Sequence, residues 1–447
     1  MAKKSSVWLI VMLCMLLPLV AACGANSPAT GTNANTGQAT KTALSPGENL
    51  YVLDGYTPQG VTNADQRIVA FHPGNLQPAY TLPAGLTSMD HRLLIATRSQ
   101  VGQTTVSVID THSGADLRSL TLAGTYSTAG MEFNNAVLSY DGHWLALRRL
   151  DASRSSTTIA LIDTQAGTLS KTIHLHGDFD LDAISTDGNA LYLLQRLNNG
   201  TGRYYVQLYT VSENELYQSP IVDKSELNDP NMTGTAIARR VASYGAETYT
   251  LYVDTYHNIA FVHILPLDPG FPFARCITLP VGKSPDLLHY YTLTLSSDGQ
   301  TLYAANGALG IVSTIRLNTG GSSNIYEDQL VTTGHFNPCL TTISSEDTSR
   351  MLRNGAVLSP DGSTLYFAGL HGIWSVKTAD LRNGHAAFHQ VLAQQSFTGI
   401  ALSADGKTLY AVDPTRGITT LDVASGRAGK VLQVPARAPW DIEWIVN

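Results

Sequence analysis

The sequence predicts an all-β protein, a single β-propeller of four-stranded antiparallel blades, and three observations lead to this prediction. The phrase Ser-x-Asp-Gly recurs along the chain, each time between an apolar segment and the start of another apolar segment. A second hairpin follows the clearest copies, and the units begin roughly every 45 to 60 residues, a period typical of propeller blades. Charged residues make up only 14% of the chain while 38 residues are Gly, a composition that favours sheets and turns over helices.

The recurring phrase has the composition of a tight turn. In each copy we expect Asp to bond its own backbone and Gly to adopt a positive φ, so that the flanking strands pair as a hairpin. Metal or phosphate binding is not expected at these turns. The five clear copies occupy residues 139–142, 185–188, 296–299, 359–362 and 403–406.

The blade count follows from the strands that return from such turns. These strands begin near residues 50, 93, 144, 191, 250, 301, 364 and 408. Eight blades are therefore favoured, and seven are the alternative. The first unit lacks an inner strand of its own, whereas residues 440–446 form a spare strand after the last unit. We expect this segment to supply the inner strand of the first blade and close the ring; the alternative is a strand added to an edge.

The N-terminus has the pattern of an exported lipoprotein. Lys3 and Lys4 precede an apolar run over residues 7–20, which has about the length of a signal-peptide core and is short for a membrane span. The run ends in LVAAC at Cys23, which resembles the lipobox of bacterial lipoproteins. The resemblance implies cleavage before Cys23 and its lipidation, and two or three acyl chains hold a protein firmly at a membrane. An ordinary cleavage site followed by Cys is the alternative.

We therefore divide the chain into a lipoprotein signal peptide (1–22), a flexible tether that begins with lipidated Cys23 (23–43) and a β-propeller (44–447). The tether sequence GANSPATGTNANTGQATKT has no hydrophobic period and almost nothing to bury. The expected location is the extracytoplasmic face of a bacterial membrane. The formal charge of −7 and the lack of basic runs give no support to nucleic-acid binding.

The repeated unit resembles a known class of propellers. Its form S-x-D-G-x-x-L-Y, followed by V-x-V-I-D-x-x-x-G, resembles the YVTN-repeat propellers of bacterial envelopes, and more distantly the lactonase-type and WD40-like propellers. The resemblance covers about residues 44–447 and implies the fold, but that superfamily contains enzymes, binding modules and structural proteins. Quinone-dependent alcohol dehydrogenases also have eight blades, yet their repeated Trp does not follow the D-x-x-x-G turn here, so no cofactor is expected.

The loops after the returning strands are the main candidate surface. In propellers they gather with the blade-to-blade connections around one mouth of the channel, and here they differ in length and charge. Arg98, Arg149 and Arg196 lie on three successive units and are the best candidates to contact an anionic ligand or partner. His257 and Arg416 are further candidates. The alternative is that these side chains are simply solvent-exposed, as charged residues on loops commonly are.

Other chemistry has weaker signals. The segment HLHGDFDLD contains His174, His176, Asp178, Asp180 and Asp182, residue types that could bind zinc. Gly177 breaks the strand alternation, however, so these side chains need not converge and no metal is expected. The sequence contains no H-E-x-x-H, G-x-S-x-G, P-loop or C-x-x-C pattern, and no catalytic residue is predicted.

Cys276 and Cys339 are the other cysteines of the expected mature chain. An exported compartment permits a disulfide between them, and neighbouring blades could bring them together; a buried thiol at Cys276 is the alternative. The favoured function is a binding or scaffold module of the cell envelope, with an unknown protein or a small anionic ligand as its partner. A lactonase-type hydrolase, or another propeller enzyme, is the alternative.

Overall fold

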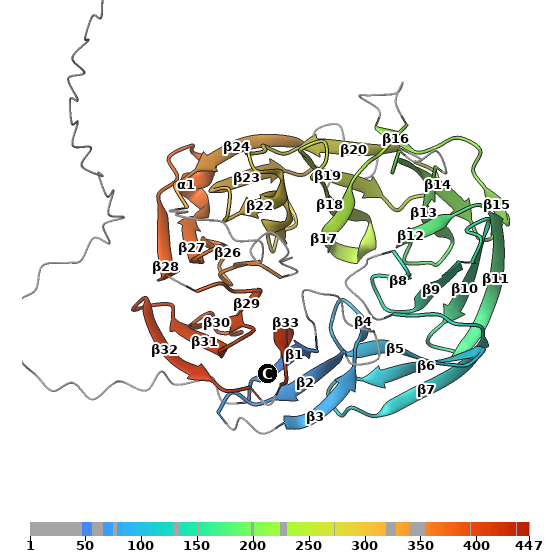
Figure 1. Ribbon diagram of the computed structural model, residues 1–447, viewed down its shortest axis with the longest axis horizontal. Coiled ribbons are helices and arrows are strands. Elements are labelled where there is room, and N and C mark those ends of the chain that lie inside the picture. Colours follow the sequence, from blue (N-terminus) through green and yellow to red (C-terminus); the bar gives the residue numbers. More distant parts are fainter. Residues whose placement is uncertain are drawn as a thin grey trace, which may run out of the picture. The chain divides into compact units, whose positions relative to one another are not determined.

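The computed structural model describes residues 47–55, 66–74, 78–128, 134–150, 152–197, 201–223, 230–271, 273–318, 328–338, 354–393, 395–434 and 436–446. Within these ranges eight antiparallel sheets are arranged radially as the blades of a β-propeller (Figure 1). The predicted fold and the favoured blade count are confirmed, and seven blades are excluded. The expected signal peptide and tether, with Cys23, lie outside the described residues, as does Cys339.

The first four blades each have four strands, which run in order from the channel to the rim. Blade 1 contains β33 (Pro439–Val446), β1 (Asn49–Asp54), β2 (Arg67–Phe71) and β3 (Pro78–Pro83). Blade 2 contains β4 (Gly85–Thr87), β5 (Leu93–Gln100), β6 (Gln103–Asp110) and β7 (Asp116–Ala123). Blade 3 contains β8 (Ala136–Leu138), β9 (Trp144–Leu150), β10 (Ser156–Asp163) and β11 (Thr168–His176). Blade 4 contains β12 (Phe179–Ile184), β13 (Ala190–Arg196), β14 (Tyr204–Thr210) and β15 (Glu215–Leu216).

The remaining blades repeat this order. Blade 5 contains β17 (Thr235–Val241), β18 (Glu247–Asp254), β19 (Ile259–Pro266) and β20 (Phe273–Thr278), with the short β16 (Val222–Asp223) added parallel to β20. Blade 6 contains β21 (Tyr291–Leu295), β22 (Thr301–Asn306), β23 (Ile311–Arg316) and β24 (Gln329–His335). Blade 7 contains β25 (Ala356–Leu358), β26 (Thr364–Gly369), β27 (Gly372–Lys377) and β28 (Phe388–Ala393). Blade 8 contains β29 (Gly399–Leu402), β30 (Thr408–Asp413), β31 (Gly417–Asp422) and β32 (Arg427–Leu432).

Helices are short and few in the described part of the chain. They are η2 (Ser243–Gly245), η3 (Pro285–Tyr290) and α1 (Thr378–Arg382). None of these helices has the length and the apolar character that crossing a bilayer requires.

The Ser-x-Asp-Gly phrases form the predicted turns between the inner and second strands. In blade 4 the Ser185 hydroxyl donates to Asp187 Oδ1 (2.6 Å), and Gly188 has a φ of 73°. Hydrogen bonds from the hydroxyl of Ser359 and the backbone of Ser363 lower the pKa of Asp361 in blade 7 to about 2. These aspartates are therefore occupied in shaping the turns, as expected.

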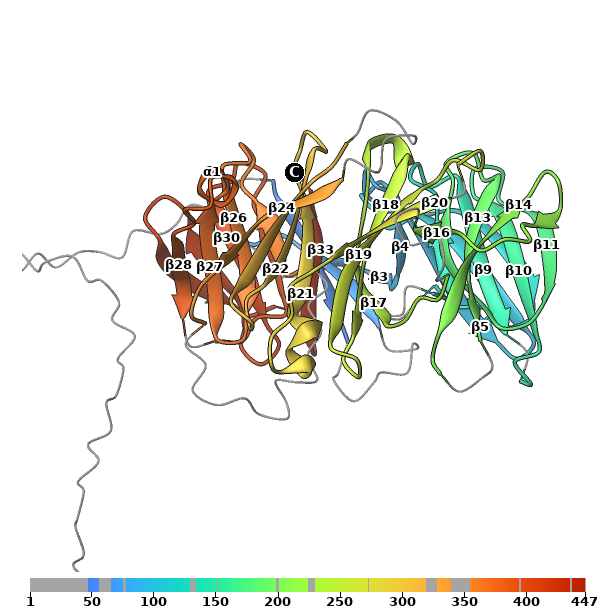
Figure 2. The same ribbon diagram turned by 90° about the horizontal axis from the view of Figure 1, so that it is seen from above.

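The turns lie at one end of the blades and the loops after the second strands lie at the other, because adjacent strands are antiparallel. We call these ends the turn face and the loop face. Figure 2 shows the blades from the side, with the strands running between the two faces. The inner strands also begin at the loop face, because each runs antiparallel to the second strand of its blade.

The last strand closes the ring, as predicted. β33 pairs with β1 along its length, with Leu50 opposite Ile445 and Leu53 opposite Asp441. The Trp444 ring stacks on that of Tyr51 at 4.6 Å between centroids. Blade 1 thus takes three strands from the start of the described chain and its inner strand from the end.

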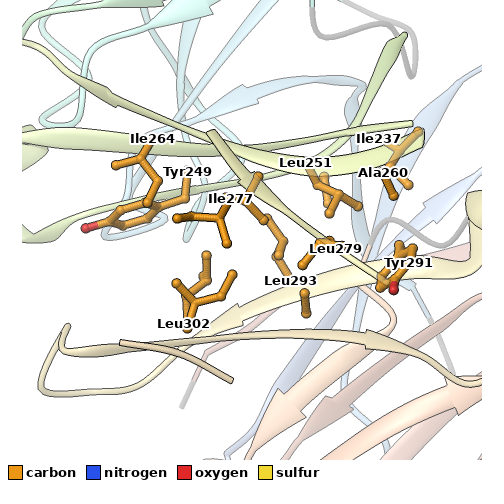
Figure 3. Packing of buried hydrophobic residues seen from close by; sticks show 14 of the residues in the cluster. Ile237, Tyr249, Leu251, Ala260, Ile264, Ile277, Leu279, Tyr291, Leu293 and Leu302 are labelled. Carbon is orange, nitrogen blue, oxygen red and sulfur yellow. The ribbon is translucent and has the colours of Figure 1, made fainter. Parts of the chain in front are cut away.

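The core consists of apolar layers between neighbouring blades, because each blade has two covered faces. The largest layer joins blades 5 and 6 and includes Leu251, Ile264, Leu293 and Leu302 (Figure 3). Burying an aliphatic side chain of this size stabilises the fold by about 1.5–3 kcal/mol. Since both faces of each sheet are buried, the strands show only a weak alternation of polar and apolar residues.

Candidate functional site

The loop face carries a group of charged side chains where blade 3 meets blade 4. We call it the arginine cluster, and it consists of Arg148, Arg149, Arg154, Arg196, Asp178 and Asp180. β9 brings the first two arginines to the loop face, β13 ends at Arg196, and the inner strand β12 begins beside the two aspartates. Two strand ends and one strand start therefore meet at the same corner of the molecule.

Asp180 is the centre of the cluster. Its Oδ2 accepts hydrogen bonds from Nε (2.7 Å) and Nη2 (2.6 Å) of Arg196, and its Oδ1 accepts one from Nη1 of Arg148. The carboxylate is 7% exposed, so these bonds replace the water that it loses. Burial alone would lower the pKa of Arg196, but the negative charge of Asp180 and the hydrogen bonds to it act together and contribute to a net rise in that pKa.

Asp178 is a second buried carboxylate, with 1% of its side chain exposed. Its Oδ2 accepts hydrogen bonds from Nε (2.7 Å) and Nη2 (2.5 Å) of Arg154. Its Oδ1 lies 3.8 Å from Nη1 of Arg148. Arg148, Arg154 and Arg196 thus share two carboxylates, and Arg148 is held between both of them.

The network extends toward blade 5. Asp182, two residues further along β12, accepts hydrogen bonds from Arg239 Nη2 (2.7 Å) and the Tyr252 hydroxyl (3.2 Å). His263 lies nearby on β19 with 1% of its surface exposed, and burial lowers the pKa of its imidazole. Three carboxylates of one short inner segment are therefore matched by basic side chains from three blades.

A pocket of about 580 Å³ opens beside the cluster, between blades 2 and 3. We call it the Arg149 pocket, and its walls are Gly124, Thr125, Tyr126, Ser127, Asn135, Arg148 and Arg149. Arg148 forms the side toward the cluster, where its Nη2 donates to Asn135 Oδ1 (2.6 Å). The blade 2 side comes from the connection that follows β7.

Arg149 is held in the pocket by neutral groups. Its guanidinium lies over the Tyr126 ring, 5.6 Å from the centroid, and Nη1 donates to the Ala123 carbonyl oxygen (3.3 Å). Within the described residues no carboxylate is within ion-pair distance of it. Gly124 makes room for this arrangement, since a Cβ there would lie 2.0 Å from Arg149 Nη1.

Blades 7 and 8 repeat the backbone of blades 3 and 4 on the opposite side of the ring. In blade 4 the Leu181 N–H donates to the Asn134 carbonyl oxygen of blade 3 (2.9 Å). In blade 8 the Ile400 N–H donates to the Asn354 carbonyl oxygen of blade 7 (3.0 Å). The same inner-strand contact therefore forms at both junctions.

The side chains at these equivalent positions differ completely. By the strand register, Gly399 stands where Asp180 stands, Ala368 replaces Arg148 and Gly369 replaces Arg149. A Cβ on Gly369 would lie 2.9 Å from the Gly307 carbonyl oxygen of blade 6. The place that corresponds to the Arg149 pocket is thus filled by backbone, and the charged cluster is not needed to form the junction.

The three predicted arginines have different environments. Arg149 lines the pocket, whereas Arg196 is bound to Asp180 and stacks on Tyr204 at 4.7 Å from the ring centroid. Arg98 is exposed on β5 and is not among the pocket's lining residues. The structure therefore does not bring the three arginines into one pocket.

Arg148 and Arg154 complete the cluster but were not singled out from the sequence. The adjacent Arg148-Arg149 pair at the end of an apolar strand was the available signal. Two consecutive strand residues point to opposite sides of a sheet, so such a pair reaches both neighbouring blades. The second signal was the spacing of the aspartates at positions 178, 180 and 182. These carboxylates are buried in the structure and pair with the arginines.

The other loop-face candidates lie outside the arginine cluster. His257 follows β18, and its Nδ1 lies 2.7 Å from Asp254 Oδ2 with 46% of the side chain exposed. Arg416 follows β30 and is 60% exposed, with its Nε 3.8 Å from Asp413 Oδ2. Each is held by the carboxylate at the end of its own strand.

The metal and disulfide candidates are also separated or undescribed. His174 and His176 are exposed on the outer strand β11, whereas Asp178 is buried beside Arg154. In the described ranges no three His, Cys, Asp or Glu side chains gather as a metal site. Cys276 lies on β20, where its N–H donates to Asp223 Oδ2 (2.6 Å), and Cys339 lies outside the described residues.

Comparison with known proteins gives the fold but no family. No family model matches the chain. A stretch of 165 residues is 27% identical to Protein HIR1 of Phaeosphaeria nodorum and spans 36% of this chain and 16% of that protein. The chain therefore spans well under two thirds of that relative.

Solved propellers resemble most of the chain. The dihydro-heme d1 dehydrogenase NirN, in complex with DHE, is 13% identical, with a TM-score of 0.51 over 90% of this chain and 75% of that one. Apo AztD from Citrobacter koseri is 12% identical, with a TM-score of 0.50 over 89% and 97%. The periplasmic gluconolactonase PpgL of Pseudomonas aeruginosa is 17% identical, with a TM-score of 0.41 over 79% and 98%. At these identities the likeness shows the fold alone.

Proposed function

We propose that this protein is a binding module: a lipid-anchored β-propeller on the extracytoplasmic face of a bacterial membrane, whose loop face binds an anionic ligand or partner. The observation that carries the proposal is the arginine cluster. It contains four guanidinium groups and two carboxylates, and only Arg148, Arg154 and Arg196 pair with Asp178 and Asp180, in a chain whose formal charge is −7. A positive surface of this kind on an acidic protein favours anions.

The contrast with blades 7 and 8 supports a functional reading of the cluster. Burying ionic groups is costly, and well-packed neutral residues are often as good for stability. At the equivalent junction Gly399 and Ala368 allow the same backbone hydrogen bond. A role in binding accounts for charges that the junction itself does not require.

Binding is tested with the full chain in detergent at constant ionic strength. We expect small carboxylates and phosphates to raise the melting temperature, because a ligand that binds only the folded state stabilises it by RT ln(1 + [L]/Kd). Neutral polyols and alkylammonium ions of similar size should leave it unchanged. Equal stabilisation by cations or neutral compounds would contradict the proposal.

The anchor is supported by the sequence motif LVAAC at Cys23 and is tested separately. After expression in a bacterium, the chain should partition into the detergent phase and carry acyl chains on Cys23 by mass spectrometry. Cys23→Ser should release the protein from the membrane fraction. An intact N-terminus, or a Cys23→Ser protein that stays with the membrane, would refute the anchor.

A lactonase-type hydrolase is the second candidate, and one observation favours it. Asp254 holds Nδ1 of His257 at 2.7 Å and leaves the partly exposed imidazole with its Nε2 available as a base on the loop face. Hydrolysis of a lactone panel, followed by base consumption in a pH-stat, tests this function. Turnover above the uncatalysed rate that disappears in His257→Ala would establish an enzyme; no turnover would leave the binding module.

A further inference from the structure

We infer that the Arg149 pocket binds a small organic dianion, a dicarboxylate or a phosphate monoester, and that Arg149 is the residue that selects for the second negative charge. The inference rests on the binding function proposed above and assigns that function to one pocket and one class of ligand. Three features support it: the charge balance of the cluster, the way in which Arg149 is held, and the size and polarity of the pocket.

The charge balance sets the number of charges on the ligand. Within the described ranges, Arg148, Arg154 and Arg196 share Asp178 and Asp180, which leaves one positive charge in excess. Arg149 adds another, because in the described part of the chain it has no carboxylate within ion-pair distance. Among the described residues, two positive charges next to one pocket therefore have no carboxylate of their own, and they match a ligand with two negative charges.

The orientation of Arg149 is fixed before any ligand arrives. The Tyr126 ring supports one face of the guanidinium, and the Ala123 carbonyl accepts from Nη1. Gly124 lets the group approach the backbone, since a Cβ there would lie 2.0 Å from Nη1. A guanidinium held in this way loses little side-chain entropy on binding and keeps N–H donors for an anion.

The remaining walls suit an organic body with oxygen acceptors. Asn135 accepts from Arg148 through Oδ1 (2.6 Å), which leaves its Nδ2 as a donor. Thr125 and Ser127 add hydroxyl groups. The volume of about 580 Å³ lies in the range of small-molecule sites, roughly 300–1,000 Å³, and exceeds what a single inorganic anion would fill.

The test compares two arginine variants by calorimetric titration of the full chain in detergent. The probes are succinate, glycerol phosphate, acetate and glycerol at constant ionic strength. Arg149→Ala should weaken both dianions by about 10- to 100-fold, the effect of one charged hydrogen-bonded contact, and acetate by less. Arg98→Ala is the matched control, because it removes the same charge from the neighbouring blade at an exposed position outside the pocket.

Each outcome decides a different question. Loss in Arg149→Ala with less than about threefold change in Arg98→Ala supports the pocket. Equal losses of dianion affinity in both variants would overturn the assignment to this pocket, because the general positive charge of the loop face would then be responsible. The proposed binding of anions would still stand. If neither dianion binds the unmodified chain but other anions still raise its melting temperature, the ligand class is wrong; if no anion does so, the binding function fails as well.

The two dianions distinguish the source of the charge. A preference for succinate assigns the site to dicarboxylates, and a preference for glycerol phosphate assigns it to phosphate monoesters. Arg149→Lys keeps the charge but not the planar pair of donors, so it should recover only part of the affinity. Full recovery with Lys would contradict the role given to the oriented guanidinium.

Discussion

Blades 2–4 and blades 6–8 are built on the same backbone plan and are filled in opposite ways. On each side an inner-strand N–H donates to a backbone carbonyl of the preceding blade, from Leu181 to Asn134 and from Ile400 to Asn354. On one side large ionic side chains occupy the loop face, and on the other side glycine and alanine bring the backbones into contact. The difference teaches that backbone hydrogen bonds and apolar layers form the propeller, while the loop-face residues vary without changing the plan.

The largest expected effect comes from removing the centre of the arginine cluster. Asp180→Ala leaves the largely buried guanidiniums of Arg148 and Arg196 without this carboxylate, which should lower the free energy of unfolding by about 3–5 kcal/mol. Urea unfolding measures it. Asp116→Ala, on the exposed surface of β7, is the control. If the free energy of unfolding falls by the same amount in both variants, the arginine cluster contributes no more to stability than an exposed carboxylate does.

A smaller loss is expected on the other side, where the space is already full. A Cβ on Gly399 would lie 2.0 Å from Asp441 Oδ1 and 3.0 Å from its Cα. Gly399→Ala should therefore lower the free energy of unfolding by about 1–3 kcal/mol, the usual cost of overpacking. Gly270→Ala, at an exposed position, is the control. If Gly399→Ala leaves the free energy of unfolding unchanged, the junction can make room for a larger side chain and is not tightly packed.

Acidification should weaken the blades that bury histidine. Burial lowers the pKa of His91, His263 and His289, whereas histidine in an unfolded chain titrates near 6.5. The unfolded state then binds more protons, so stability falls as the pH drops through about 6.5, by at most about 1.4 kcal/mol per pH unit for each histidine. Glu247 opposes this trend, because burial raises its pKa.

Urea unfolding at pH 7.5 and 5.5 measures the pH effect. His91→Asn should flatten the dependence, since Asn tolerates the positive φ of 55° at this position. Hydrogen exchange adds a local test, because blade 7 has no buried histidine among its described residues. Its amides should keep their protection at the lower pH while those of β19 lose it. Equal stability at both pH values would contradict the prediction.

The smallest effects are expected for the arginines that face solvent or the pocket. Arg98→Ala should change the free energy of unfolding by less than about 0.5 kcal/mol, as is usual for exposed residues. Arg149→Ala loses its contact with the Tyr126 ring, which contributes about 0.5–1 kcal/mol. Thermal unfolding of both variants measures this. A loss at Arg149 as large as that at Asp180 would mean that the pocket arginine supports the fold.

The fold was predictable because its signals are local. The turn at 185–188 depends on Ser, Asp and Gly within four residues. Asp187 accepts from the nearby Asn189 N–H and Gly188 has a positive φ, as the sequence indicates. The closing strand β33 was predictable by counting, since one unit lacked an inner strand and one segment was left over. Neither inference needed knowledge of contacts between distant residues.

The site was only partly predictable because its partners are distant in the sequence. Arg196 lies at the end of β13 on the loop face, and its pairing with Asp180 depends on β12 and β13 lying side by side. The sequence does not mark Arg148 as a buried charge. Strands that are covered on both faces lack the alternation of polar and apolar residues that would distinguish a buried side from an exposed one. The sequence shows the aspartates near Gly177 only as weak metal candidates beside His174, whereas the fold turns them inward and leaves the histidine on the outer strand.

The closure of blade 1 by β33 also sets the order in which the protein can be completed. The hydrogen bond from Ala438 N to Asp54 Oδ1 joins residues 384 positions apart. At typical rates of synthesis of 5–20 residues per second, β1 waits roughly 20 to 80 s for its neighbour. Throughout this interval an apolar strand edge stays open to pairing with other chains. Nascent chains stalled just before residue 439 should therefore be the form of this protein most prone to aggregate.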